Sequence, residues 1–271
     1  MKTLGPPDRD WIVALLDSAR TDTMFPQSNL RTHGFGGTHM RALRLWGVRD
    51  RAVLALGNDG MILPYLPDPS DIPAAAEILR GERLRGAAGP ARMVRPLLDA
   101  LGLTEAPKSL DADEPQFELS LDALIVPEGP GDLVPVSVDA ERAICWRQAY
   151  NAELQTGSRT LEDTTREVEG WIAEDSHRFL VVDGRPAAMT GFNATLPEIV
   201  QVGGVYTPPE TRGRGLARRA LALHLAEARA TGVETATLFA ASDAAVACYT
   251  PLGFQRTGTF TLLFFEPKVT P

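Results

Sequence analysis

Apolar residues recur with a helical period in the stretch 216–232. Ala217, Leu221 and Leu225 fall four positions apart, so they share one stripe of a helix that packs against a sheet. The glycine that closes the stretch predicts the end of this helix. The run before it, residues 198–207, reads as a strand interrupted by two adjacent glycines. A strand, a short loop and an amphipathic helix are therefore expected in this order.

Turn signals and apolar runs divide the rest of the chain into further strands and helices. The segments 58–60 (NDG) and 183–184 (DG) each predict a tight hairpin, because such turns need the positive φ that Gly, Asn and Asp tolerate. Helices are expected at 11–19, and in the second half at 140–154 and 161–175. A last strand is expected at 258–266, and strands and helices together indicate an α/β (α+β) fold.

A segment rich in proline and glycine, Val126–Asp132 (VPEGPGD), is predicted to be a linker. The expected domains are therefore 1–127 and 133–271. The two halves form a loose repeat of αβ modules, in which the turn at Gly60 is matched with that at Gly184. In the same alignment, Gly86 in the first half corresponds to Gly213 in the second.

Composition and charge restrict the classes of function. The 271 residues are 44% hydrophobic and carry a formal net charge of −8, which argues against a general nucleic-acid binder. No apolar run approaches the ~20 residues that span a bilayer, and no signal peptide is predicted. The two cysteines, Cys145 and Cys248, form no CxxC pair and are expected to be buried or half-buried thiols in a reducing cytoplasm.

One local exception to this acidic composition precedes the predicted helix. Arg212, Gly213, Arg214 and Gly215 follow one another where the strand ends. The first turn of a helix offers free N–H groups, glycines allow close approach, and arginines pair with phosphate oxygens, so a pyrophosphate is the ligand expected here. A P-loop signature is absent, and the dinucleotide fingerprint GxGxxG is only half met because Arg218 occupies its last position. The alternative is a surface turn with solvated arginines.

Together with a second motif, these residues resemble the GNAT superfamily of N-acetyltransferases. The segment 210–217 (ETRGRGLA) is similar to the family signature [Q/R]-x-x-G-x-[G/A], with Glu210 in place of Gln or Arg. The segment 242–254 (SDAAVACYTPLGF) is similar to N-x-x-A-x-x-x-Y-x-x-x-G-F, with Ser242 where Asn is usual. The resemblance covers about residues 133–266. It implies two modules, the first degenerate, each with a mixed, mostly antiparallel twisted sheet flanked by helices.

The resemblance also implies an activity, acetyl transfer from acetyl-CoA to a primary amine by direct attack, without a metal. Tyr249 would protonate the departing thiolate, and Glu198 or a water relay would take the proton of the amine. The N–H group of Val205 would stabilise the oxyanion beside the splay at 203–204. The residues implied to bind acetyl-CoA are Val205, Thr207, Arg212, Gly213, Arg214, Gly215, Leu216, Ala217 and Ser242.

Two functions stay open at this point. The first is an N-acyltransferase for a small-molecule or peptide amine, and the second is a binding module that senses acyl-CoA without turnover. The strand at 258–266 is expected in the core, with a homodimer edge as its alternative. His33 and His39 are expected to be solvated rather than metal ligands, and His224 to be a satisfied histidine at an interface.

Overall fold

The computed structural model describes residues 1–154 and 160–271. By its internal contacts the chain divides into two units. Unit 1 consists of Met1–Pro115 together with Gly258–Pro271, and unit 2 of Gln116–Thr257. The expected boundaries, 1–127 and 133–271, differ from these. Residues 116–127 belong to unit 2 and residues 258–271 belong to unit 1, so each unit contains a strand from the other half of the chain. The predicted linker Val126–Asp132 lies inside unit 2.

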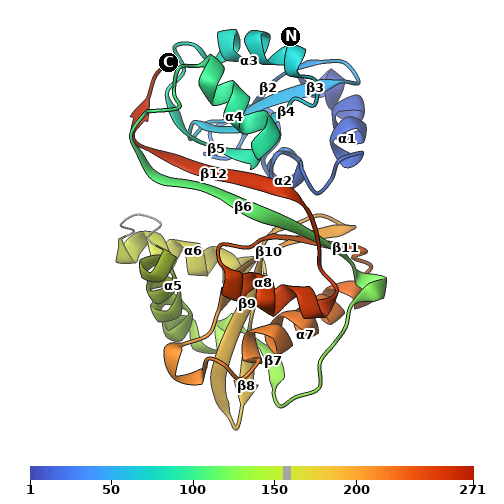
Figure 1. Cartoon of the computed structure of the whole chain (residues 1–271), viewed down its shortest axis with the longest axis vertical. Helices are drawn as coiled ribbons and strands as arrows, with labels where there is room; N and C mark the ends of the chain where they lie inside the picture. Colours follow the sequence, from blue (N-terminus) through green and yellow to red (C-terminus); the bar gives the residue numbers. More distant parts are fainter. Residues whose placement is uncertain (155–159) are drawn as a thin grey trace. The chain divides into compact units, whose positions relative to one another are not determined.

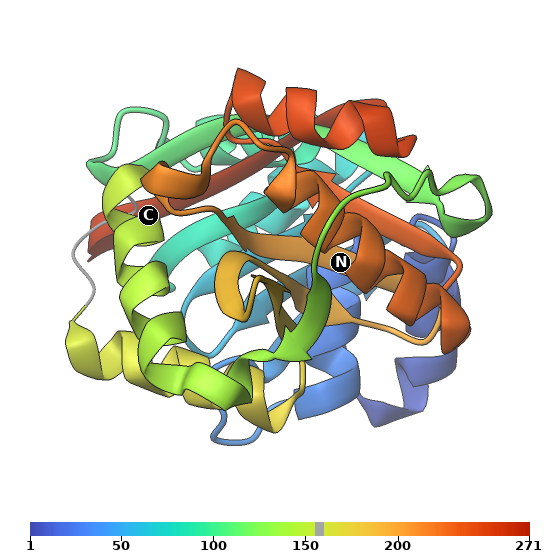
Figure 2. The same ribbon diagram turned by 90° about the horizontal axis from the view of Figure 1, so that it is seen from below.

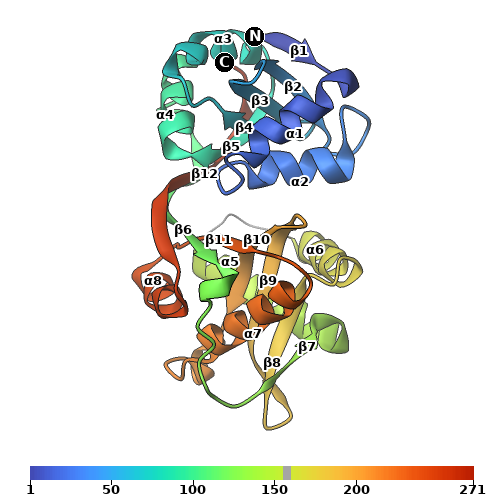
Figure 3. The ribbon, with the colours of Figure 1, turned by 90° about the vertical axis from the view of Figure 1, so that its right-hand side faces the viewer.

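Unit 1 is a six-stranded sheet with helices, and its last strand comes from the end of the chain. The sheet order is β1-β2-β3-β4-β5-β12, and all neighbours are antiparallel except β4 and β5. Figure 3 shows β12 (red) alongside β5. The strands are β1 (Lys2–Leu4), β2 (Leu43–Val48), β3 (Ala52–Gly57), β4 (Met61–Tyr65), β5 (Leu84–Pro90) and β12 (Gln255–Val269); the helices are α1 (Arg9–Asp17), α2 (Met24–His33), α3 (Ile72–Leu79) and α4 (Ala91–Ala100).

Unit 2 has the same order of elements and borrows its edge strand from the first half of the chain. The sheet order is β6-β11-β10-β9-β8-β7, in which only β10 and β11 are parallel. The strands are β6 (Lys108–Ser120, of which 116–120 pair here), β7 (Asp132–Pro135), β8 (His177–Val182), β9 (Arg185–Thr195), β10 (Ile199–Tyr206) and β11 (Thr235–Phe239); the helices are α5 (Ala140–Leu154), α6 (Leu161–Ala173), α7 (Leu216–Ala230) and α8 (Asp243–Tyr249).

Two hydrophobic clusters cover the two faces of the unit 2 sheet. On one face, residues of α5 and α6 pack with Phe179 and Met189. On the other, α7 and α8 pack with Val200 and Val202. In Figure 1, α5 and α6 lie to the left of β9 and α7 to its right, and Figure 2 shows the same helices from below. The predicted stripe of α7 is confirmed at Leu221, which is fully buried.

The predicted hairpins are confirmed, whereas the predicted register of the repeat is wrong by one element. The turn at Gly60 joins β3 to β4, whereas the turn at Gly184 joins β8 to β9. By the order of elements, β8 and β9 correspond to β2 and β3, so the two turns are not equivalent. Gly86 lies inside β5, where a Cβ would meet the backbone oxygen of Leu263, and not in a loop before a helix. Short glycine-containing αβ blocks look alike in sequence, and the order of all the elements is needed to align them.

Candidate active site

The loop between β10 and α7 forms a group of free backbone donors. Gly213 and Gly215 have φ of +74° and +75°, values that glycine adopts without strain. Gly215 is the N-cap residue, so α7 begins at Leu216. Within the described part of the chain, no backbone acceptor is found for the N–H groups from Gly213 to Ala217. A Cβ at either glycine would meet nothing within 4 Å, so the space beside the loop is open.

Unlike the N–H groups from Gly213 to Ala217, the N–H group of Arg212 has a backbone acceptor. It donates to the carbonyl oxygen of Pro209 at 3.3 Å. Its guanidinium donates to both carboxylate oxygens of Glu153 on α5, each at 2.7 Å, and to the carbonyl oxygen of Thr207 at 2.8 Å. It also lies 5.8 Å from the ring centre of Tyr206. Arg212 therefore ties the loop to α5, and the carbonyl of Thr207 already has a donor.

The other three arginines of this stretch have different surroundings. Arg218 donates to the carbonyl oxygens of Ala247 and Cys248, at 3.0 and 3.2 Å, near the end of α8. Arg219 donates to the carbonyl oxygen of Pro127 at 2.5 Å and is half-buried. The structure describes no hydrogen bond or ion pair for Arg214, which is exposed. Of the four side chains, that of Arg214 is the one left to meet an anion.

The sheet opens next to this loop. The parallel ladder of β10 and β11 runs from Ile199 to Gln201, and beyond it β10 pairs only with β9. The Gln201 carboxamide donates to the carbonyl oxygen of Val202, the first residue beyond the ladder, at 2.6 Å. Gly204 has φ of +62° at an irregularity between Gly203 and Tyr206. The expected splay is present, and Val205 has no register partner on either side.

Tyr249 and Ser242 mark the two ends of α8. The Ser242 hydroxyl caps this helix by accepting the N–H of Ala245 at 3.2 Å, a local role that the Asn of the family motif would also fill. Tyr249 is buried at the other end, in the cluster on the α7 face, with its ring centre 6.1 Å from that of Phe254. The cluster also contains Val205 at its edge, so the tyrosine and the open part of β10 share one face of the sheet.

Glu198 lies directly before the ladder of β10 and β11, at the end away from the opening. Its carbonyl oxygen accepts the N–H groups of Glu234 and Thr235, at 2.9 and 3.0 Å. Its side chain is exposed, with no ion pair in the described residues. Gly204 lies six positions further along the chain, a path of ~20 Å at the rise of an extended strand. A carboxylate placed there is exposed to solvent and lies too far from the opening for direct contact.

His177 is a buried residue next to the opening that no sequence pattern indicated. It is 1% exposed, its ring stacks on Trp171 at 3.8 Å, and its Nδ1 lies 2.9 Å from the hydroxyl of Ser176. Burial lowers the pKa of this imidazole well below its usual value, with smaller contributions from His224, Arg147 and Arg178. No sequence motif marks the residue, because its position follows from the pairing of β8 with β9.

The other histidines follow their predictions only in part. His224 is buried and stacks on Phe192 at 3.9 Å, but its Nδ1 has no partner in the described residues, so it is not fully satisfied. His33 and His39 stack on each other at 3.7 Å; His39 is exposed as expected, and His33 is half-buried. Outside 155–159, no group of three or more His, Cys, Asp or Glu is placed to hold a metal ion.

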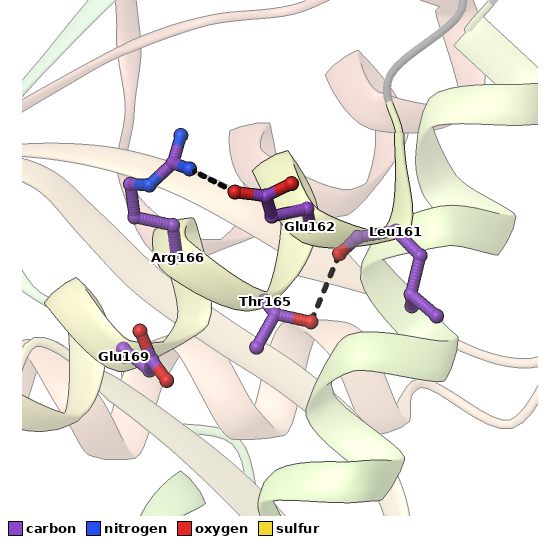
Figure 4. A pocket seen from close by; sticks show the side chains of 5 residues that line it. All are labelled: Leu161, Glu162, Thr165, Arg166 and Glu169. Atoms are coloured by element: carbon purple, nitrogen blue, oxygen red, sulfur yellow. Dashed lines mark hydrogen bonds and ion pairs between the residues drawn. The ribbon is translucent and has the colours of Figure 1, made fainter.

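One hollow of the surface lies apart from the residues described above. A hollow of about 590 Å³ is lined by one face of α6, and none of the expected site residues belongs to it (Figure 4). It is lined by Leu161, Glu162, Thr165, Arg166 and Glu169.

Among the helices described here, none combines the length and the apolar character needed to cross a membrane.

The comparison with protein families agrees with this geometry. Residues 143–254 match the profile described as "Acetyltransferase (GNAT) family". The expected resemblance of the second half of the chain to the GNAT family is therefore confirmed. The match extends over the loop Gly213–Ala217, which we call the cradle loop, and over the opening of the sheet and Tyr249. It ends at Phe254, the last residue of the second predicted motif.

Two curated relatives carry the name mycothiol acetyltransferase. The protein from Kytococcus sedentarius is 36% identical over 115 residues, which are 40% of this chain and 39% of that protein. The protein from Thermobispora bispora is 30% identical over 219 residues, which are 76% of this chain and 65% of that protein. The chain thus spans less than two thirds of the length of either.

Solved structures extend the likeness of fold over both units. A GCN5-related N-acetyltransferase from Kribbella flavida is 20% identical, with a TM-score of 0.60 over 91% of this chain and 95% of that one. A tandem GNAT protein from the clavulanic acid biosynthesis pathway is 17% identical, with a TM-score of 0.55 over 97% and 96%. The expected fold, with mixed and mostly antiparallel sheets flanked by helices, is therefore confirmed.

Proposed function

We propose that unit 2 is an N-acetyltransferase that moves the acetyl group of acetyl-CoA to a primary amine by direct attack. The observation that carries this proposal is the free donor loop Gly213–Ala217 next to the place where β10 leaves β11. The loop offers positive backbone groups to a pyrophosphate, and the opening admits the thioester arm. The match of residues 143–254 to the GNAT profile supports the same reaction.

The residues of the loop fit a pyrophosphate by their chemistry. Consecutive N–H donors, a helix N-terminus and the exposed guanidinium of Arg214 all favour an anion. The open space in front of Gly213 and Gly215 leaves room for phosphate oxygens. In our proposal the carbonyl group of Val205 and the N–H group of Thr207 pair with the pantetheine arm, and Leu216 and Ala217 complete the cradle with their N–H groups. Arg212 contributes by holding the loop, and Ser242 by capping α8.

The chemistry needs three groups around the thioester carbon. The amine nitrogen forms the new C–N bond, and the N–H of Val205 stabilises the oxyanion. The C–S bond then breaks, and Tyr249 donates its proton to the thiolate of coenzyme A. The proton of the attacking amine leaves through water to Glu198, whose exposed position suits a terminal proton acceptor.

Unit 1 takes no part in this chemistry according to the proposal. By the order of elements, the loop 66–71 between β4 and α3 corresponds to the cradle loop. It contains no glycine, and its Asp68 and Asp71 would repel a pyrophosphate. Asp71 is buried and binds Arg51 through both carboxylate oxygens, at 2.5 and 3.0 Å. The domain scheme that we propose therefore keeps a degenerate first half and a catalytic second half.

The proposed acceptor is a small-molecule amine, and the names of the two curated relatives make the amine substrate of mycothiol acetyltransferases the first one to test. Cys248 is half-buried as expected, whereas Cys145 is exposed, so the expectation of burial is wrong for Cys145. We place the reaction in the cytoplasm, because both cysteines are unpaired, as is usual in a reducing compartment. The alternative function is an acyl-CoA sensor without turnover. The shared face of Tyr249 and the open part of β10 favours the enzyme.

The test is acetyl-CoA-dependent release of free thiol with a panel of amines, comparing the wild type with Tyr249→Phe. The variant is expected to lose a factor of roughly 100 or more in kcat, as is typical for a lost general acid, while its Kd for acetyl-CoA stays unchanged. Tyr65→Phe in β4 is the control and keeps full activity. Saturable binding without turnover on the whole panel would favour the sensor, and the absence of binding would overturn both functions.

A further inference from the structure

His177 is buried beneath the irregular part of β10. It is the first residue of β8 and lies directly opposite Gly191 of β9, which in turn pairs with Gly203 of β10. Residues directly opposite in neighbouring strands share a face of the sheet, so the imidazole and both glycines lie on one face. Phe179, two residues further along β8, packs with α5 and α6, which identifies this face as the one that those helices cover.

Gly191 and Gly204 leave the space that the imidazole of His177 fills. A Cβ on Gly191 would come within 2.1 Å of the ring, and a Cβ on Gly204 would lie 2.9 Å from its Nε2. The ring therefore rests on the backbone of two strands with the indole of Trp171 stacked on it, at 3.8 Å and an angle of 10°. A side chain packed in this way cannot move without moving the backbone of the bulge.

The two nitrogens of this ring have different surroundings. Nδ1 lies 2.9 Å from the hydroxyl of Ser176, whose backbone oxygen accepts the N–H of Phe192 in β9 at 3.0 Å. Nε2 is buried and has no hydrogen-bond partner in the described residues, and it faces Gly204. The polar contact thus fixes one end of the ring to β8 and β9, and the other end touches β10 where the sheet opens.

Gly204 has a positive φ in this contact. Its φ of +62° belongs to the irregularity through which β10 changes its register with β9 between Gly203 and Tyr206. The conformation of Gly204 sets the direction of the next peptide group, which carries the N–H of Val205. The position of the imidazole is thereby connected to the N–H that we assign to the oxyanion.

We propose that His177 is a positioning residue, which holds the bulge at Gly204 so that the N–H of Val205 points into the opening between β10 and β11. This inference rests on the proposed function. The residue touches neither acetyl-CoA nor the amine, and it acts through the backbone of β10. It should therefore affect the step that needs the oxyanion donor and leave the affinity for acetyl-CoA unchanged.

The chain offers a matched control in His224. Its imidazole is also buried and stacked on an aromatic ring, that of Phe192, and one of its nitrogens also lacks a partner. It lies on α7, on the opposite face of the sheet, and no glycine of the bulge has it among its nearest neighbours. The loss of a buried imidazole is the same in both variants, and only His177→Leu removes the contact with the bulge.

The experiment compares His177→Leu with His224→Leu by steady-state kinetics, by acetyl-CoA affinity and by hydrogen exchange of the backbone at 202–206. For His177→Leu we expect kcat to fall roughly 10- to 100-fold, as a displaced catalytic group does, with a Kd for acetyl-CoA within twofold of the wild type. Exchange at 202–206 should become faster. His224→Leu should keep kcat within twofold and leave exchange in this segment unchanged.

Equal kcat values for the two variants, or equal exchange at 202–206, would overturn the proposal, and so would a rise in Kd that parallels the loss of kcat. If His177→Leu does not fold, His177→Gln provides the same comparison with a planar polar group. If the wild type shows no turnover, the proposed function fails, and the exchange comparison still decides whether His177 holds the bulge.

Discussion

One added methyl group at Gly215 tests the proposed cradle. In Gly215→Ala, the left-handed backbone at φ +75° costs ~1–2 kcal/mol of folding free energy, because a Cβ crowds the following carbonyl there. The new methyl group meets no protein atom within 4 Å, so this backbone cost is the whole expected loss of stability. At ~2–4 °C per kcal/mol for a chain of this size, Tm should fall by ~2–8 °C.

The same methyl group would occupy the space beside the free N–H groups of the loop. If that space receives the pyrophosphate, the Kd for acetyl-CoA should rise at least ~10-fold, which corresponds to ~1.4 kcal/mol of binding free energy. Calorimetric titration of the folded variant with acetyl-CoA measures this change. Strain alone cannot produce it, since strain acts on folding and the titration is done well below Tm.

Gly232 provides the control, because it follows the other end of α7. It also has a positive φ, +99°, and its Cβ would also meet nothing within 4 Å. It lies 17 residues from Gly215, which is ~25 Å along a helix. Gly232→Ala should therefore lower Tm by a similar amount and leave the Kd for acetyl-CoA unchanged. Equal Kd values in the two alanine variants would refute the cradle.

Three further outcomes are expected. Arg214→Ala should weaken acetyl-CoA binding several-fold at low salt and less at high salt, whereas Arg219→Ala should lower Tm with unchanged affinity; calorimetry and thermal unfolding measure both. Equilibrium dialysis should give one acetyl-CoA per chain, because the acidic loop 66–71 excludes a second; two would contradict this. Burial lowers the pKa of His224 to about 3, so its neutral form contributes stability that is complete above pH ~6.5 and is lost as the pH falls. His224→Leu should therefore lose ~2 kcal/mol less unfolding free energy than the wild type between pH 7 and 5 in urea titrations, and equal losses would contradict the buried neutral state.

The local parts of the site were predictable from the sequence. The glycines of the proposed cradle have a positive φ, and the amphipathic helix after them has a clear period, so both could be read from neighbouring residues. Tyr249 followed from a motif whose spacing is local to α8 and the turn after it. Each of these features depends on residues fewer than fifteen positions apart.

The parts that were not predicted depend on contacts between distant segments. The strand exchange places 116–120 in unit 2 and 258–271 in unit 1, and neither segment differs in pattern from an ordinary strand. Arg219 finds its acceptor at Pro127, and Arg212 finds its acceptor at Glu153. Arginines that bind protein groups cannot be distinguished from arginines that bind a ligand until the fold brings these partners together.

A crystal structure of the full chain with acetyl-CoA is the most direct test of the central claim. The account predicts that the pyrophosphate accepts hydrogen bonds from the N–H groups between Gly213 and Ala217, with the thioester in the opening beside Val205. Tyr249 should then lie within hydrogen-bond distance of the sulfur. Acetyl-CoA bound elsewhere on the chain, with the loop free, would contradict the account.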